Sequence, residues 1–168
     1  MATFRIPIFG FATLPGGGGD TYFETASVTQ TNDLISQLVA RFQDTATKIG
    51  IGGRFVVPKN YVGSPKIIVM WTSTATSGNV VWDFDYVAIG GNDSESLDPS
   101  AFTESVTVTD AAPTASQRKL DAEMSLTAGN LAADDIVEFL ISRDGASGSD
   151  TMAAAAILYQ ILFEYTDS

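Results

Sequence analysis

An alternation of apolar and polar residues with a period of two runs through most of this 168-residue chain. Successive side chains of a β-strand point to opposite faces, so this period predicts strands that bury one face. The clearest example is segment 119–127, where one face carries Leu120, Ala122, Met124 and Leu126. The other face carries Lys119, Asp121, Glu123 and Ser125. The chain is therefore expected to build its core from strands.

Further segments follow the same rule. Segment 135–143 sets Val137, Phe139 and Ile141 against Glu138, Leu140 and Ser142. The last strand is expected over about 156–165, with Ile157, Tyr159, Ile161, Phe163 and Tyr165 in phase. Segment 66–74 is apolar on both faces, which is typical of a central strand covered on both sides or of a sandwich corner. The short, polar and β-branched segment 105–110 predicts an edge strand.

Three local features remain to be placed. Ser77–Gly78–Asn79 is a tight-turn signal, and it predicts a hairpin between segment 66–74 and a second strand over 80–89. Segment 32–43 has helical spacing of its apolar residues, but we favour a strand for its second half. The glycines at 50, 52 and 53 predict a turn or bulge before segment 54–58.

Eight or more strands with turns between them, and no helical repeat, predict an all-β, antiparallel β-sandwich of the jelly-roll type. Residues 1–22 are expected to be an extended arm with a glycine-rich hinge, and residues 23–168 the sandwich. Pro7 interrupts the arm, which ends in Gly16–Gly17–Gly18–Gly19. Such an arm either folds back on its own domain or packs on another subunit. The second alternative makes its apolar residues partner-binding: Phe4, Ile6, Ile8, Phe9 and Phe11.

Composition excludes several functions. The formal net charge is −11, from 20 acidic and 9 basic residues, which disfavours binding to nucleic acid or to an anionic membrane surface. Cysteine and histidine are absent, so the chain has no thiol nucleophile, no cysteine metal site and no imidazole for proton transfer. A serine-hydrolase triad is excluded for the same reason. We predict that the chain is not an enzyme and needs no cofactor or metal.

Two acidic features have alternative interpretations. Asp83 and Asp85 share one face of a strand, about 7 Å apart by strand rise. That spacing suits the carboxyl pair of an inverting glycosidase, but a solvated strand face is favoured, and a cation or a basic partner is the remaining alternative. Segment 144–150 is superficially similar to a calcium loop but lacks the alternating oxygen ligands, so a Gly/Ser turn is favoured. The acidic stretch 92–98 has no spacing diagnostic of a cation site.

Two other kinds of site are considered. The glycine clusters at 16–19 and 50–53 lack the following Lys and Ser/Thr of a phosphate-binding loop, so no phosphate site is predicted. An aromatic platform for sugar would use Tyr22, Tyr61 or Trp71, although Trp71 is expected in the core.

The strands at 54–58, 66–71 and 80–86, with Asp144, Asp150–Thr151 and the strand at 159–165, resemble small jelly-roll virion proteins of tailed bacteriophages. The resemblance covers about residues 47–167 and includes capsid decoration (cement) proteins and head or tail fibre domains. It implies a homotrimer on the capsid exterior that binds the major capsid protein or other virion subunits. It implies no catalytic residues.

The resemblance predicts a structural virion protein that clamps neighbouring shell subunits, with the arm as its anchor. The alternative is a carbohydrate- or receptor-binding sandwich, such as a lectin-like domain or a fibre knob, because the same architecture serves both roles.

Overall fold

The computed structural model describes residues 1–8, 12–13, 21–25, 38–91 and 95–167. Regular structure in these residues is almost entirely strand, with one short 3-10 helix. The elements are β1 (Thr3–Ile8), β2 (Ala12–Thr13), β3 (Thr21–Thr25), β4 (Leu38–Phe42), β5 (Lys48–Val56), β6 (Tyr61–Thr72), β7 (Asn79–Ile89), β8 (Glu104–Ala111), β9 (Leu120–Ser125), η2 (Ala128–Asn130), β10 (Ile136–Asp144) and β11 (Ala156–Asp167).

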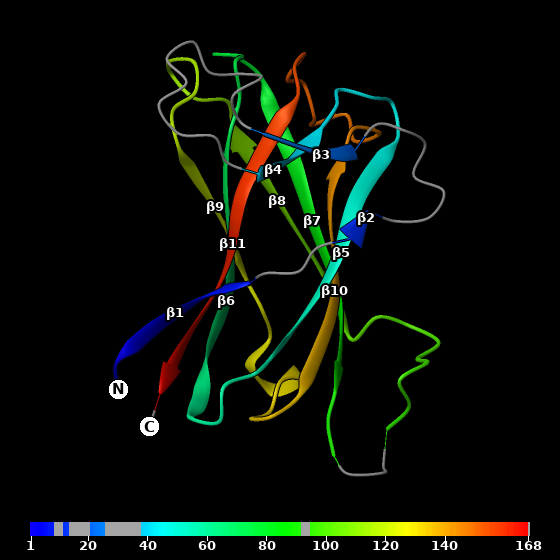
Figure 1. The fold of residues 1–168 in the computed structure, drawn as a ribbon, viewed down its shortest axis with the longest axis vertical. Coiled ribbons are helices and arrows are strands. Elements are labelled where there is room, and N and C mark those ends of the chain that lie inside the picture. The colour runs from blue at the N-terminus through cyan, green and yellow to red at the C-terminus, as the bar shows by residue number, and fades with distance from the viewer. Residues whose placement is uncertain (9–11, 14–20, 26–37, 92–94, 168) are drawn as a thin grey trace.

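The strands form two antiparallel sheets that pack face to face (Figure 1). Sheet A has the order β3-β4-β11-β6-β9, and β1 also pairs with β11. Sheet B has the order β2-β5-β10-β7-β8. The predicted class, an all-β antiparallel sandwich of the jelly-roll type, is confirmed.

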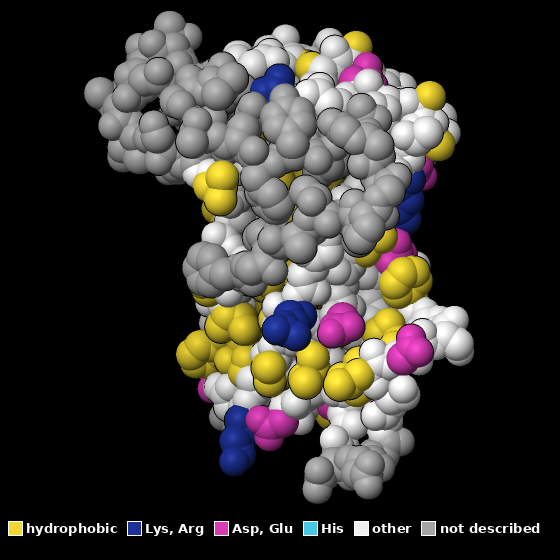
Figure 2. Space-filling view, turned by 45° about the vertical axis from the view of Figure 1, so that its right-hand side comes forward, with side chains coloured by type: hydrophobic (Ala, Val, Ile, Leu, Met, Phe, Trp, Pro, Cys, Tyr) yellow, Lys and Arg dark blue, Asp and Glu magenta, His cyan; other side chains and the backbone are white. Residues whose placement is uncertain are grey.

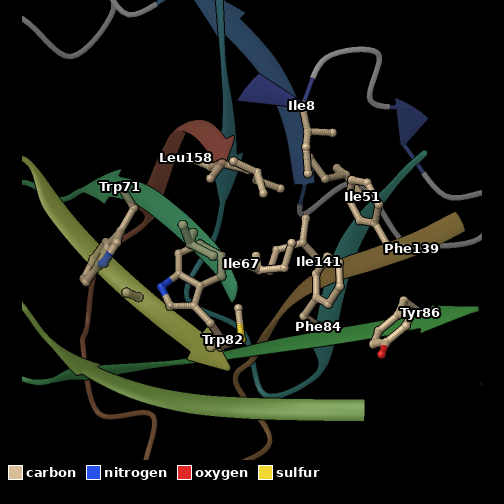
Figure 3. Packing of buried hydrophobic residues seen from close by; sticks show 14 of the residues in the cluster. Ile8, Ile51, Ile67, Trp71, Trp82, Phe84, Tyr86, Phe139, Ile141 and Leu158 are labelled. Carbon is tan, nitrogen blue, oxygen red and sulfur yellow. The ribbon is translucent and has the colours of Figure 1, made fainter. Parts of the chain in front are cut away.

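The inner faces of the two sheets meet in one aromatic-rich core (Figure 3). Trp71 of β6 and Trp82 of β7 lie edge to face across it, with ring centroids 5.9 Å apart. Phe84 of β7 stacks on Phe139 of β10 at 5.1 Å. Tyr86 completes the buried face of β7, as the alternation predicted. Burying one such ring stabilises the fold by about 1.5–3 kcal/mol.

The alternating strands keep their predicted faces. Ala122 and Met124 of β9 are buried while their neighbours along the strand are exposed. The three apolar residues predicted to share a face of β10 are likewise buried: Val137, Phe139 and Ile141. β8 lies at the end of sheet B, which confirms the predicted edge strand. Alternation therefore identified the buried face of each of these strands.

The predicted hairpin between segments 66–74 and 80–89 is wrong. β6 pairs with β11 and β9 in sheet A, whereas β7 pairs with β10 and β8 in sheet B. The turn between them does exist, and Gly78 adopts a left-handed backbone with φ of +89°. It carries the chain from one sheet to the other because both strands bury a large apolar face. Because β6 and β7 face each other across the core, both of their apolar faces are buried at once.

The predicted turn or bulge at the glycines of 50–53 is also wrong. These residues lie inside β5, which pairs with β10 over nine consecutive positions without a register shift. Gly50 is required by close packing rather than by turning. A Cβ at this position would lie 2.5 Å from Ser142 Oγ and 2.8 Å from the Ile141 carbonyl oxygen.

The second half of segment 32–43 is strand β4, as predicted, and residues 32–37 lie outside the described residues. Within the predicted arm, β1 pairs with β11 of its own domain over Thr3 to Ile8. The structure therefore shows the fold-back alternative for these residues. The predicted boundary at residue 22 stays a prediction.

Candidate functional site

Two adjoining hollows lie at the end of the sandwich where β7 leaves the sheet. The larger, of about 550 Å³, lies between the β7–β8 connection and the segment around η2; its lining includes Glu95, Thr103, Asn130 and Asp135. The smaller, of about 400 Å³, lies along the β7–β8 connection and is lined by residues that include Glu95, Ser96, Ser100 and Phe102. Because Ala88, Glu95 and Thr103 line both, the hollows form one continuous surface.

In the larger hollow, the carboxylates of Glu95 and Asp135 both lie close to Gly90. Glu95 Oε2 accepts a hydrogen bond from the Gly90 amide at 2.6 Å. Asp135 Oδ2 accepts one from the Ala132 amide at 2.7 Å. A Cβ on Gly90 would lie 2.3 Å from Asp135 Oδ1, so a side chain here would push into the carboxylate. Glycine at position 90 thus lets the two acidic side chains approach the same stretch of backbone.

Glu104, the first residue of β8, connects β7 to the segment around η2. Its carboxylate accepts hydrogen bonds from the Tyr86 hydroxyl at 2.7 Å, the Thr127 amide at 3.0 Å and the Thr127 hydroxyl at 2.7 Å. Burial acts to raise the pKa of Glu104, but the hydrogen bonds from Thr127, Tyr86 and Asn130 outweigh it and lower the pKa. For Tyr86, burial and then the Glu104 carboxylate both raise the pKa. The Glu104 carboxylate therefore stays charged, and the Tyr86 hydroxyl stays protonated, at neutral pH.

The smaller hollow carries an exposed aromatic ring. Phe102 is 54% exposed although it belongs to a connection anchored at both ends. The Thr103 amide donates to the Tyr86 carbonyl at 2.7 Å, and the Ala88 amide donates to Thr103 Oγ1 at 3.0 Å. These bonds hold the backbone next to Phe102 against β7. The hollow thus combines an exposed ring with hydroxyl and carboxylate groups.

The acidic pair predicted on the solvated face of β7 is in fact covered. Asp83 and Asp85 are each only 7% exposed, and the Lys48 ammonium lies between them, 2.9 Å from Asp83 Oδ2 and 3.0 Å from Asp85 Oδ2. The Lys48 side chain extends from β5 across β10 to reach them. Gly50 of β5 and Ser142 of β10, which pair with each other between the two ends of this contact, are both small. Burial opposes the charge on Lys48, but hydrogen bonds to both carboxylates outweigh it and raise the pKa of Lys48. An ammonium of the chain itself occupies the position considered for a cation or a basic partner.

The Gly/Ser turn predicted over 144–150 is confirmed. The Ala146 amide donates to Asp144 Oδ1 at 3.1 Å, and the Ser147 amide to the Asp144 carbonyl at 3.1 Å. Asp150 is committed to a buried ion pair with Arg143, at 2.7 Å. Within the described part of the chain, no group of three or more acidic side chains is placed to hold a metal ion.

The other residues singled out from the sequence fall in different places. Trp71 is buried in the core, as expected, and its Nε1 donates to Asp110 Oδ2 at 2.8 Å. Tyr61 is half-buried against Phe163, and its hydroxyl donates to the Ala128 carbonyl at 3.2 Å. The side chain of Tyr22 lies outside the described residues. Tyr61 is thus packed into the sandwich rather than presented as a platform.

The predicted partner-binding residues of β1 become more exposed toward the N-terminus. Ile8 is 1% exposed in the core, Ile6 packs against the core, and Phe4 is 41% exposed. Phe9 and Phe11 lie outside the described residues. Their role in binding a partner stays a prediction.

Sequence patterns do not identify the residues of the loop-end hollows. Glu95 stands out only as part of an acidic stretch, and no motif marks Phe102 or Asp135. The one signal is Phe102 itself, a large aromatic residue in a connection of mostly small and polar residues. Such a residue indicates either burial by distant residues or a contact surface.

Charges on the face shown in Figure 2 are mixed. Among the coloured, described residues, Lys and Arg side chains lie singly between acidic and hydrophobic ones, and neither sign gathers into a patch. These residues form no basic stripe to follow a phosphate backbone. Among the described residues, no helix has the length and apolar character needed to cross a membrane.

Comparison with known proteins supports the fold. No protein-family profile matches the sequence, and no curated protein matches it. A solved CBM35 from Paenibacillus barcinonensis matches with a TM-score of 0.52 and 11% identity over 100% of both chains. The carbohydrate-binding module CBM28, described as specific for non-crystalline cellulose, matches with a TM-score of 0.54 and 8% identity over 94% of this chain and 89% of that one.

A third solved structure is an arabinose-bound α-L-arabinofuranosidase, MgGH51, with a TM-score of 0.51 and 9% identity. The match covers 95% of this chain but 24% of the enzyme, so the chain spans about a quarter of that protein. At such identities the likeness establishes a jelly-roll β-sandwich and nothing finer. The phage identity suggested by the resemblance gains no support from these neighbours. The virion role, the capsid partner, the trimer and the capsid location therefore stay predictions.

Proposed function

We propose that the chain is a carbohydrate-binding β-sandwich that holds a glycan in the two loop-end hollows. The observation that carries this proposal is the exposed ring of Phe102 beside the hydroxyl and carboxylate groups of the same surface. A sugar presents an apolar C–H face and a rim of hydroxyl groups. An aromatic ring packs against that face, while nearby polar groups fix its orientation. The jelly-roll likeness to carbohydrate-binding modules supports the same role.

The carboxylates of the larger hollow have the acceptor capacity that sugar hydroxyls require. A carboxylate offers about four acceptor positions. Within the described residues, Glu95 and Asp135 each accept one backbone hydrogen bond, and no lysine or arginine pairs with either. Asp83 and Asp85 differ, because Lys48 already occupies them. The loop end is thus better suited to accept hydroxyl donors than the outer face of sheet B.

The test is a glycan array followed by calorimetric titration of the intact chain with the best oligosaccharide. Phe102→Ala and Glu95→Gln should each weaken binding at least about tenfold, since each removes one of the two kinds of contact. Phe4→Ala is the matched control, because it removes a partly exposed ring from sheet A, and it should leave binding unchanged. The proposal fails if no glycan binds saturably, or if binding is equal in all three variants.

A further inference from the structure

The pairing of β1 with β11 is a second feature of the fold, separate from the loop-end hollows. β1 completes an edge of β11 that β4 leaves uncovered. β4 pairs with β11 over Ala156 to Leu158, and β1 pairs with it over Ile161 to Thr166. Without β1, this half of the β11 edge would present unpaired backbone groups and an uncovered apolar row. An exposed edge of this kind is a template for pairing with another chain.

Contacts at both ends fix the register of β1 on β11. The Ala2 amide donates to Asp167 Oδ1 at 2.8 Å, and the Asp167 amide donates to the Ala2 carbonyl at 3.1 Å. At the other end, Gln160 Nε2 donates to the Ile8 carbonyl at 2.8 Å. The pairing is therefore a defined joint, made almost entirely between β1 and the last strand.

Side chains give the joint an apolar inner face and a charged outer face. Ile8 is buried in the core, and Phe4 stacks on Tyr165 with ring centroids 5.8 Å apart. On the outer face, Arg5 Nε donates to Glu164 Oε2 at 2.6 Å. The pairing of β1 with β11 thus has a fixed register, an apolar face that packs on the core and an ion pair on its outer face. These features make strand addition specific.

Charge separates this segment from the rest of the chain. Residues 1–19 contain Arg5 and no acidic residue, so their side chains carry +1, while the remaining residues carry −12 to reach the total of −11. Two copies of the acidic body repel each other, but the arm of one copy is attracted to the body of another. The arm is therefore attracted to the acidic body of a second copy as well as to its own.

We propose that the β11 edge is an interface between copies of this chain, in which β1 of one copy takes the place of β1 in a second copy. Residues 14–20, with Pro15 and the four glycines, separate β1 and β2 from β3 in the sequence, so β1 and β2 exchange together. Every contact described above is the same in the closed and exchanged forms. Concentration therefore decides between them, and exchange becomes favourable near the effective concentration of a short linker, about 1 mM.

The absence of cysteine from the chain makes a direct test possible. Thr3 and Thr166 face each other across the β1–β11 pair, at a separation that a disulfide spans in antiparallel sheets. Thr3→Cys and Thr166→Cys are made in separate chains, mixed at concentrations up to about 1 mM and oxidised with oxidised glutathione. Strand exchange should give a disulfide-linked heterodimer whose yield rises with concentration. The double variant Thr3→Cys/Thr166→Cys should close within one chain at low concentration.

Random collision is measured with Thr3→Cys mixed with Ser105→Cys, since Ser105 is exposed on β8 in the other sheet. A heterodimer yield severalfold above this control supports exchange. A yield equal to the control, with the double variant still closing within one chain, overturns it. Failure of the double variant to close also overturns it, because β1 would then not lie on β11.

Discussion

The two ends of the sandwich hold charge in opposite ways. At the end beyond β10, the Arg143 side chain is fully buried and donates to both oxygens of Asp150, at 2.9 and 2.7 Å. It also donates to the Met152 and Ala154 carbonyls, each at 2.6 Å. At the loop end, within the described residues, Glu95 and Asp135 meet only backbone amides.

The difference teaches which charges serve the fold and which are available to a ligand. A buried charge with every donor nitrogen paired holds a connection in place, because removing its partner leaves it uncompensated in a poor solvent. Glu95 is exposed and Asp135 is buried, but each lines the larger hollow and has acceptor positions that no partner among the described residues occupies. The end beyond β10 is therefore structural, and the loop end is the candidate site.

The largest effect is expected at the structural end, for Arg143→Met. This change leaves the Asp150 carboxylate buried without its partner, and should lower the free energy of unfolding by about 3–5 kcal/mol. Urea denaturation measures it. Lys119→Met is the control, because its ion pair with Asp121 is largely exposed and should be worth less than about 1 kcal/mol. Equal losses in the two variants would contradict the contrast between buried and exposed charge.

Smaller effects on the free energy of unfolding are expected from replacing a glycine by alanine at each end of the sandwich. A Cβ on Gly145 would lie 1.9 Å from the Thr45 carbonyl oxygen, so Gly145→Ala should cost about 1–3 kcal/mol through overpacking against backbone. At the loop end, a Cβ on Gly129 would meet nothing within 4 Å, and Gly129→Ala should change stability by less than about 0.5 kcal/mol. Thermal unfolding of both variants checks the pair. A loss at Gly129 as large as that at Gly145 would show that the loop end is packed as tightly.

The contribution of Glu104 to the stability of the loop end should depend on pH. Its folded pKa lies below the unfolded value of about 4.3, so its contribution is fully present above that pH. The contribution is lost as the pH falls through the lowered folded pKa. Glu104→Gln should therefore flatten the acid side of the stability curve, by at most about 1 kcal/mol because water screens this partly exposed group. Urea denaturation between neutral and acidic pH measures it, and an unchanged curve would contradict the assignment.

The smallest effect on stability is expected for Phe102→Ala. Because the ring is largely exposed, its removal should change the free energy of unfolding by less than about 0.5 kcal/mol. Phe84→Ala, at a fully buried ring, should cost about 3–5 kcal/mol in the same measurement. If Phe102→Ala destabilises comparably, the ring belongs to the core rather than to a binding surface.

Local patterns in the sequence were enough to predict most of the strands and the residues that face the core. Met124 in β9, Ile141 in β10 and Trp82 in β7 all point inward as their period of two required. This follows because alternation is a property of one strand and needs no knowledge of its neighbours.

Which strands pair, and which polar groups meet, was decided by the tertiary structure. β6 and β7 follow each other in the chain and still lie in different sheets, because apposed faces bury more apolar surface than a hairpin would. Lys48 reaches Asp83 and Asp85 only because β10 lies between their strands with small side chains in its path. Phe102 and Asp135 share the loop end for a similar reason, since β10 begins where β7 finishes. The sequence by itself determined strands, faces and net charge, which depend on neighbouring residues, whereas the site depends on contacts between distant ones.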